Sequence, residues 1–129
     1  MKADRFFSVH YDIRHNPKVE LLRDACGGMS ALGRWIALMS ILYDVGGVYD
    51  ISSEMKHRYL RKELEFESGE ELEEFLEAAA ECELIDAGML EAGRVASKGV
   101  TDQLEYSKKK SEAGRKGNEK RWSGAKKKG

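Results

Sequence analysis

The residues with the clearest chemistry lie at the C-terminal end of the sequence, where lysine and arginine are concentrated. Residues 107–129 carry ten Lys or Arg against two Glu, although the whole chain has a formal net charge of −1. Cations at this density pair with phosphate groups, and the aromatic face of Trp122 among them is free to stack on a base. The pattern favours contact with a nucleic acid over the alternative, a tail that only keeps the chain soluble.

A segment of opposite charge precedes this basic one. Residues 63–92 contain twelve Asp or Glu and neither Lys nor Arg. The near-neutral total therefore hides an acidic block followed by a basic block, and by itself it says little about partners.

Metal binding and catalysis are the other kinds of chemistry to consider. His10, Asp12 and His15 are metal-ligand types within six residues, but their spacing matches no known metal site. His10 and Asp12 would share one face of an extended segment, and a full site needs a third ligand and supporting contacts that the sequence does not show. Bonding the start of the first helix is a better role for His10 or Asp12. The sequence has no Ser-His-Asp or Cys-His order, no HExxH motif and no glycine-rich loop after a strand. We predict no catalysis, no metal site and no cofactor, and we interpret Cys26 and Cys82 as buried thiols.

Length and composition predict one folded domain. Of the 129 residues, 41% are hydrophobic, and nearly all the large apolar side chains precede residue 107. We therefore predict a domain over residues 1–106 and a basic, disordered tail over residues 107–129. No apolar run approaches the roughly 18 residues of a membrane span, and the first residues lack the apolar stretch of a signal peptide. A cytoplasmic protein without membrane contact is expected.

Capping residues and apolar spacing predict two helices near the N-terminus. Asn16 caps a first helix that starts at Pro17, runs to about Cys26 and ends at residues 27–28, which are both glycine. Ser30 is expected to cap a second helix over residues 31–44. Its apolar residues lie almost all the way round, as in a buried central helix.

The same signals predict two more helices. Ser52 or Ser53 caps a third, on which Met55, Tyr59, Leu60 and Leu64 are expected to face inward. Ser68 and Glu71 form a capping box for a fourth over residues 69–82. The expected core lies between the second and fourth helices and comprises Trp35, Ile36, Leu38, Met39, Leu42, Leu72, Phe75 and Leu76.

Two segments carry strand signals. Residues 48–51 alternate apolar and polar side chains between glycines and serines, which indicates a short strand. Residues 84–96 are interpreted as two strands joined by a tight turn. Ser97 then caps a final helix. The predicted fold is mainly α with a small β-hairpin, in the winged helix-turn-helix order, with residues 84–96 as the wing and residues 69–82 as the recognition helix.

Three segments also carry a resemblance to a family. They are FFSVHYDIRHNPKVELL at 6–22, LGRWIALMSILYDVGGVY at 32–49 and SEAGRKGNEKRW at 111–122. Together they resemble the N-terminal winged-helix domain of phage and mobile-element replication proteins, the DnaD-like replisome organisers and their relatives. The resemblance implies a non-enzymatic part of a DNA replication or primosome-assembly protein. Its implied partners are DNA and other replication proteins. From the basic tail we expect DNA binding of low sequence specificity, and further copies of the chain are another expected partner.

One segment departs from the usual docking of this fold. The helix predicted in the recognition position carries six glutamates, which would be brought close to phosphates in a major groove at a cost of several kcal/mol. We therefore expect DNA to contact the tail first, and basic residues of the third helix and the wing second. The candidate nucleic-acid-binding residues are Lys108, Lys109, Lys110, Arg115, Lys116, Lys120, Arg121, Trp122, Arg58, Arg61, Lys62, Arg94 and Lys98.

An alternative function belongs to a different class. The chain would be a protein-interaction or self-assembly module of a replication complex, whose acidic helix and aromatic N-terminal strand make the contacts. The folded domain would then not touch DNA. Salt-dependent DNA binding distinguishes the two hypotheses.

Overall fold

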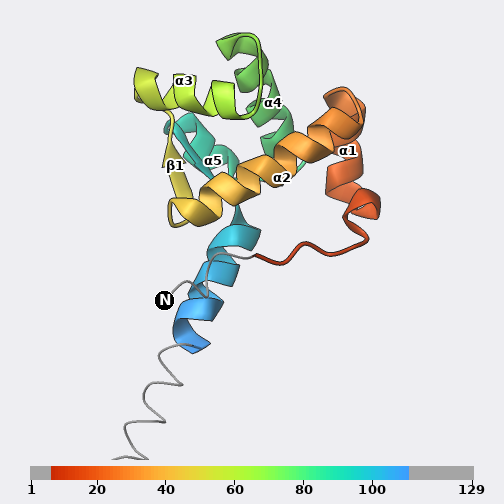
Figure 1. Cartoon of the computed structure of the whole chain (residues 1–129), viewed down its shortest axis with the longest axis vertical. Coiled ribbons are helices and arrows are strands. Elements are labelled where there is room, and N and C mark those ends of the chain that lie inside the picture. Colours follow the sequence, from red (N-terminus) through yellow and green to blue (C-terminus); the bar gives the residue numbers. More distant parts are fainter. Residues whose placement is uncertain (1–6, 111–129) are drawn as a thin grey trace, which may run out of the picture.

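The computed structural model describes residues 7–110, which form a mainly helical fold with one two-stranded antiparallel sheet. This confirms the predicted mainly-α class with a small sheet. A further helix, over residues 98–110, ends the described chain (Figure 1). The other elements in chain order are η2 (Ile13–His15), α1 (Pro17–Ala25), α2 (Met29–Asp44), β1 (Val48–Asp50), α3 (Glu54–Glu63), α4 (Gly69–Glu81), α5 (Ala87–Glu91) and β2 (Arg94–Ala96).

The first two helices begin and end where local chemistry requires it. The Asn16 side chain accepts hydrogen bonds from the amides of Lys18 and Val19 and so caps α1, as predicted. Gly27 and Gly28 then take φ angles of 91° and 79°, which only glycine adopts without strain. The expected cap at Ser30 is wrong, because α2 already begins at Met29 with Gly28 as its N-cap.

The caps of α3 and α4 were predicted correctly. Ser53 accepts a hydrogen bond from the Lys56 amide, and Ser68 accepts one from the Glu71 amide. The turn between these helices passes through Glu65, whose φ of 59° is in the left-handed region. α4 spans Gly69–Glu81, so the predicted boundaries of the fourth helix, 69–82, are correct to within one residue.

The two strands come from opposite sides of the α3–α4 pair in the sequence. β1 and β2 run antiparallel, with Val48 opposite Ala96, Tyr49 opposite Val95 and Asp50 opposite Arg94. The sheet therefore joins the segment before α3 to the segment after α4.

The predicted hairpin over residues 84–96 is wrong. Residues 87–91 form α5 instead, because the Asp86 side chain accepts a hydrogen bond from the Met89 amide and starts a helical turn. Of that segment only residues 94–96 are a strand, and they pair with β1. The buried side chains of Tyr49 and Val95 explain this choice, because the pairing brings both into the core.

Most of the expected core is buried. Trp35, Leu38, Leu42 and the three named residues of α4 are buried, whereas Ile36 and Met39 are only partly so. The core extends beyond these two helices, since side chains of α1, α3, β2 and the last helix join it. It is thus a single cluster that spans the whole described domain.

The inward face expected for α3 is partly wrong. Leu60 and Leu64 are buried, but Met55 and Tyr59 are 80% and 52% exposed. Met55 lies about 140° and Tyr59 about 100° around the helix from Leu60, at about 100° per residue. A short helix with one buried side chain per turn leaves such positions in solvent.

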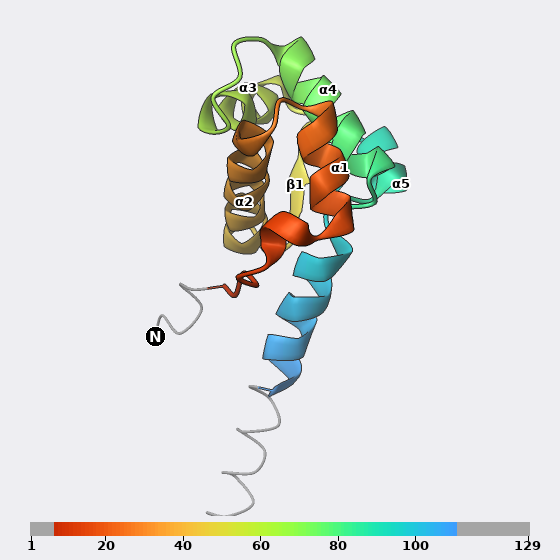
Figure 2. The ribbon, with the colours of Figure 1, turned by 90° about the vertical axis from the view of Figure 1, so that its right-hand side faces the viewer.

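The last helix projects away from the rest of the fold. It begins directly after β2 and is anchored by the buried Val100, and it points away from α3 and α4 (Figures 1 and 2). In the N-terminal segment, the Phe7 ring stacks on Tyr43 of α2 with a centroid distance of 4.8 Å. No single helix among residues 7–110 has the length and apolar composition of a membrane-spanning segment.

Candidate nucleic-acid interface

The helix predicted in the recognition position, α4, presents an acidic face to solvent. Its apolar side chains Leu72, Phe75 and Leu76 are buried, as their spacing predicts. Its glutamates are all exposed, namely Glu70, Glu71, Glu73, Glu74, Glu77 and Glu81. Like-charge repulsion would oppose the approach of DNA phosphates to this face.

The candidate cations of α3 differ in how free they are. Lys62 is exposed, and Arg58 is exposed with its Nη2 3.6 Å from the Glu54 carboxylate. Arg61 is partly buried, and its Nη1 donates hydrogen bonds to the carbonyls of Phe66 (3.0 Å) and Glu67 (3.4 Å). The guanidinium of Arg61 is therefore engaged with the backbone of the α3–α4 turn.

A second arginine, Arg34, holds the same turn from α2, and it is not among the residues predicted from the sequence. Arg34 of α2 donates from Nε to the Leu64 carbonyl (2.8 Å) and from Nη2 to the Glu65 carbonyl (3.0 Å). Its guanidinium also lies 4.1 Å from the centre of the Phe66 ring. An arginine inside an otherwise apolar helix was the available signal, because a buried stem needs partners for its charged end.

We expect the Arg34→Ala variant to lose about 1–3 kcal/mol of unfolding free energy, because two charge-assisted hydrogen bonds and a cation–π contact disappear. The Arg34→Lys variant should recover only part of the lost stability, since an ammonium group lacks the planar fork of donors by which the guanidinium bonds two carbonyls. Urea unfolding followed by circular dichroism measures the loss. Arg58→Ala is the matched control, because an exposed ion pair contributes about 0–1 kcal/mol. Equal small losses for Arg34→Ala and Arg58→Ala would remove Arg34 from its role at the turn.

The candidate cations near the sheet lie among acidic partners. Arg94 is exposed on β2 opposite Asp50, whose pKa is lowered mainly by hydrogen bonds from Ser52 and less by the charges of Lys56 and Arg94. Lys98 Nζ donates to Asp102 at 2.8 Å, and this bond raises the pKa of the lysine. The carboxylate of Asp102, one helical turn away, thus offsets the positive charge of Lys98.

The tail cations are placed only in part. Lys108, Lys109 and Lys110 are exposed in the described helix, which includes residues 107–110 of the predicted tail. Arg115, Lys116, Lys120, Arg121 and Trp122 lie outside the described residues. Because the last helix points away from α3, its lysines and the α3 cations do not form one surface (Figure 1).

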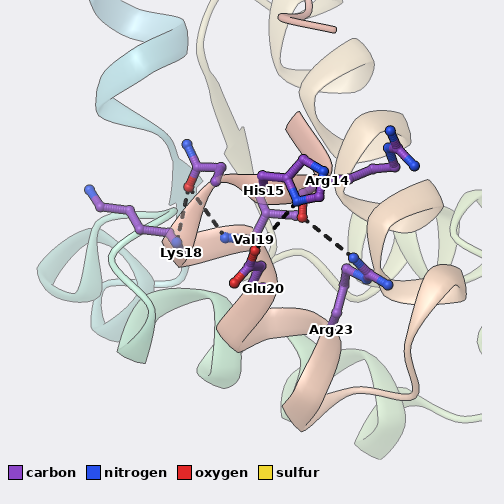
Figure 3. A network of polar contacts seen from close by, with 7 residues as sticks. Arg14, His15, Lys18, Val19, Glu20 and Arg23 are labelled. Carbon is purple, nitrogen blue, oxygen red and sulfur yellow. Dashed lines mark hydrogen bonds and ion pairs between the residues drawn. The ribbon is translucent and has the colours of Figure 1, made fainter. Parts of the chain in front are cut away.

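The N-terminal histidines form no metal site with one another. His15 lies 3.8 Å from the Glu20 carboxylate, in the polar network around the α1 cap that also joins Arg23 to the Arg14 carbonyl (Figure 3). Within residues 7–110, no cluster of three or more His, Cys, Asp or Glu side chains is arranged to hold a metal ion. The contacts of His15 are those of a helix start.

The two cysteines are free and only partly buried, at the C-terminal caps of α1 and α4. Burial raises the pKa of both thiols, and the nearby Cys82 raises that of Cys26 further. A raised pKa lowers the fraction of reactive thiolate at neutral pH.

Hollows in the described surface include a groove and a smaller pocket. A groove of about 1340 Å³ lies between the N-terminal segment and the start of the last helix, and its lining mixes Lys18 and Lys98 with Asp12, Asp86 and Asp102. A smaller one, of about 420 Å³, lies between α4 and α5. Neither offers a uniformly basic surface to a nucleic acid.

Comparison with known proteins adds no relative. No protein-family model, no curated protein and no solved structure matches this chain.

Proposed function

We propose that this chain binds DNA as the winged-helix domain of a phage or mobile-element replication protein, of the replisome-organiser kind. Contact is made mainly through the basic segment 107–129 and with low sequence specificity. The observation that carries the proposal is the separation of charge, with ten cations beyond residue 106 and an exposed acidic helix in the folded part. The protein acts without catalysis, alongside other replication proteins.

The arrangement of the elements supports the winged-helix part of the proposal. α2, α3 and α4 follow one another as three helices, with β1 inserted before α3. β2 follows α4 and pairs back with β1, so the helix-turn-helix pair is flanked by a small sheet. In this reading α5 stands where the first strand of a wing would run.

The charge distribution supports contact by the tail rather than by α4. A winged helix that used α4 in the major groove would bring six exposed glutamates to the DNA. The described lysines 108–110 instead stand on a helix that projects from the domain (Figure 2). The folded part then serves to present the tail and to meet other proteins.

The second candidate function is a protein-interaction or self-assembly module without direct DNA contact by the folded domain. It is favoured by the exposed apolar side chains of α3, where Met55 and Tyr59 stand in solvent. Exposed apolar side chains of this size are common at protein interfaces.

A binding measurement tests the proposal. The whole chain should bind fluorescein-labelled duplexes of two unrelated sequences with similar affinity at low salt, as fluorescence anisotropy reports. A chain truncated after Tyr106 should bind neither, while its circular dichroism spectrum stays helical. Absence of binding by the whole chain at low salt would reject DNA as a partner and leave the second function.

Neutralising the acidic face should not harm DNA binding. The Glu73→Gln, Glu74→Gln and Glu77→Gln triple variant should bind duplex DNA as tightly as the natural chain or more tightly, because three repulsive charges are removed. Anisotropy at low salt gives the comparison. A clear loss of affinity with an intact fold would return α4 to the DNA interface.

Trp122 should matter most for single strands. Its replacement by Ala should weaken binding of a single-stranded oligonucleotide by about 1–3 kcal/mol, since an unpaired base can stack on the indole. Binding of a duplex should change less, because its bases are already stacked. Equal losses on both substrates would argue against base stacking.

A further inference from the structure

The groove between α4 and α5 combines an apolar floor with an acidic rim. Its apolar lining, here called the floor, comprises the partly exposed Ile51, Ala80 and Leu90 and the buried Leu76. Its rim carries four exposed glutamates, Glu73, Glu77, Glu81 and Glu91. This hollow, of about 420 Å³, therefore offers both apolar and acidic groups to an occupant.

The rim glutamates are largely without partners in the described chain. Glu73 lies 3.5 Å from His57, but Glu77, Glu81 and Glu91 form no ion pair within residues 7–110. Glu73, Glu77 and Glu81 follow one another at i,i+4 spacing on α4, where like charges repel each other and destabilise a helix. A cationic occupant of the groove would relieve this repulsion.

The sequence of the same chain contains a segment with the complementary chemistry. Lys120, Arg121 and Trp122 place two cations beside the only large apolar side chain beyond Tyr106. An indole suits the floor, and the ammonium and guanidinium groups suit the carboxylates on either side. Another cluster of tail cations, Lys126 to Lys128, has no adjacent aromatic residue.

The connection is long enough for this segment to return. The last helix starts directly after β2, and the amide of Asp86, just before α5, donates to the Ala96 carbonyl of β2 at 2.9 Å. Thirteen helical residues, 98–110, carry the chain about 20 Å from that point. Trp122 follows Lys110 by twelve residues, which span up to about 40 Å when extended.

We propose that the groove between α4 and α5 holds the segment around Lys120–Trp122 of the same chain. Trp122 covers the apolar floor, and the two cations pair with the rim glutamates. The docked segment is withheld from other polyanions. If the proposed function holds, the groove and DNA compete for the same residues, so the acidic helix regulates DNA binding without touching DNA.

The test uses the whole chain without DNA, so its result is independent of the DNA-binding proposal. Replacing Lys120, Arg121 and Trp122 by Gln, Gln and Ala should shift the ¹H–¹⁵N signals of Ile51, Ala80 and Leu90. Signals of Met55 and Arg58, on α3, should stay in place. Replacement of Lys126, Lys127 and Lys128 by Gln is the matched control in the tail and should leave the groove signals unchanged.

The reciprocal variants test the rim. After Glu77, Glu81 and Glu91 are replaced by Gln, the tail replacements should no longer shift the groove signals, whereas after Glu63, Glu67 and Glu70 are replaced they should still do so. Circular dichroism checks that both triple variants stay folded. Groove signals that ignore the tail, or equal effects of both triple variants, would overturn the proposal. Groove shifts that vanish on tenfold dilution would overturn it too, because they would place the tail of a second copy in the groove.

Discussion

Replacement of Leu76 by Ala should lower the free energy of unfolding by about 2–5 kcal/mol. Leu76 is 1% exposed and lies in the core, where its loss removes buried apolar surface and leaves a cavity. The Ile36→Ala variant should lose less unfolding free energy, because Ile36 is only partly buried. Urea unfolding followed by circular dichroism, with the slope of each transition compared, gives the unfolding free energies of the natural chain and of the two variants.

Met55 provides the control for this prediction. It is also apolar and also helical, but it is 80% exposed, so Met55→Ala should stay within about 0.5 kcal/mol of the natural chain. A Leu76→Ala variant as stable as Met55→Ala would mean that α4 does not pack on the core through this face. The apolar spacing of α4 would then have no energetic consequence.

The features predicted correctly from the sequence are those that a few neighbouring residues decide. Asn16, Ser53 and Ser68 each cap a helix through an amide two or three residues away, so the signal and its effect lie within one turn. The burial of Leu72, Phe75 and Leu76 likewise follows from spacing along one helix. Such features need no knowledge of the rest of the fold.

The sheet could not be predicted in the same way. Arg94–Ala96 pairs with Val48–Asp50, more than forty residues earlier, and nothing in a three-residue run identifies its partner. The hairpin hypothesis chose the nearer partner, residues 84–86. Asp86 carried a contrary signal, because a side chain that caps the Met89 amide favours a helical turn there.

The candidate interface was predicted from the positions of charged residues. Charge alone does not reveal which cations already form hydrogen bonds within the protein. Arg58, Arg61 and Lys62 look equivalent on a helical projection, yet Arg61 bonds the Phe66 carbonyl while Lys62 is exposed. Arg34 is absent from the predicted residues because its partners are backbone carbonyls about thirty residues away in the sequence. Side chain to backbone contacts of this kind depend on the packing of two helices.

The affinity of the whole chain for duplex DNA should fall steeply with salt. If about six of the ten cations in residues 107–129 pair with phosphates, log affinity should fall against log salt concentration with a slope near −5, at roughly −0.9 per phosphate. Between about 50 and 200 mM salt this amounts to roughly a thousandfold loss. Anisotropy titrations at four or five salt concentrations measure the slope.

Two triple variants locate the cations responsible. Replacing three lysines of the last helix by Gln should flatten the slope by up to about 2.7, because three phosphate contacts are lost. These lysines are Lys108, Lys109 and Lys110. Arg58, Lys62 and Arg94 replaced by Gln remove the same charge from the exposed surface of the folded part and should change the slope far less. The reverse outcome would move the DNA surface to α3 and β2, and segment 107–129 would then act only as a linker. Since the two variants have equal net charge, a difference between them reports where the phosphates lie and not how many cations the chain carries.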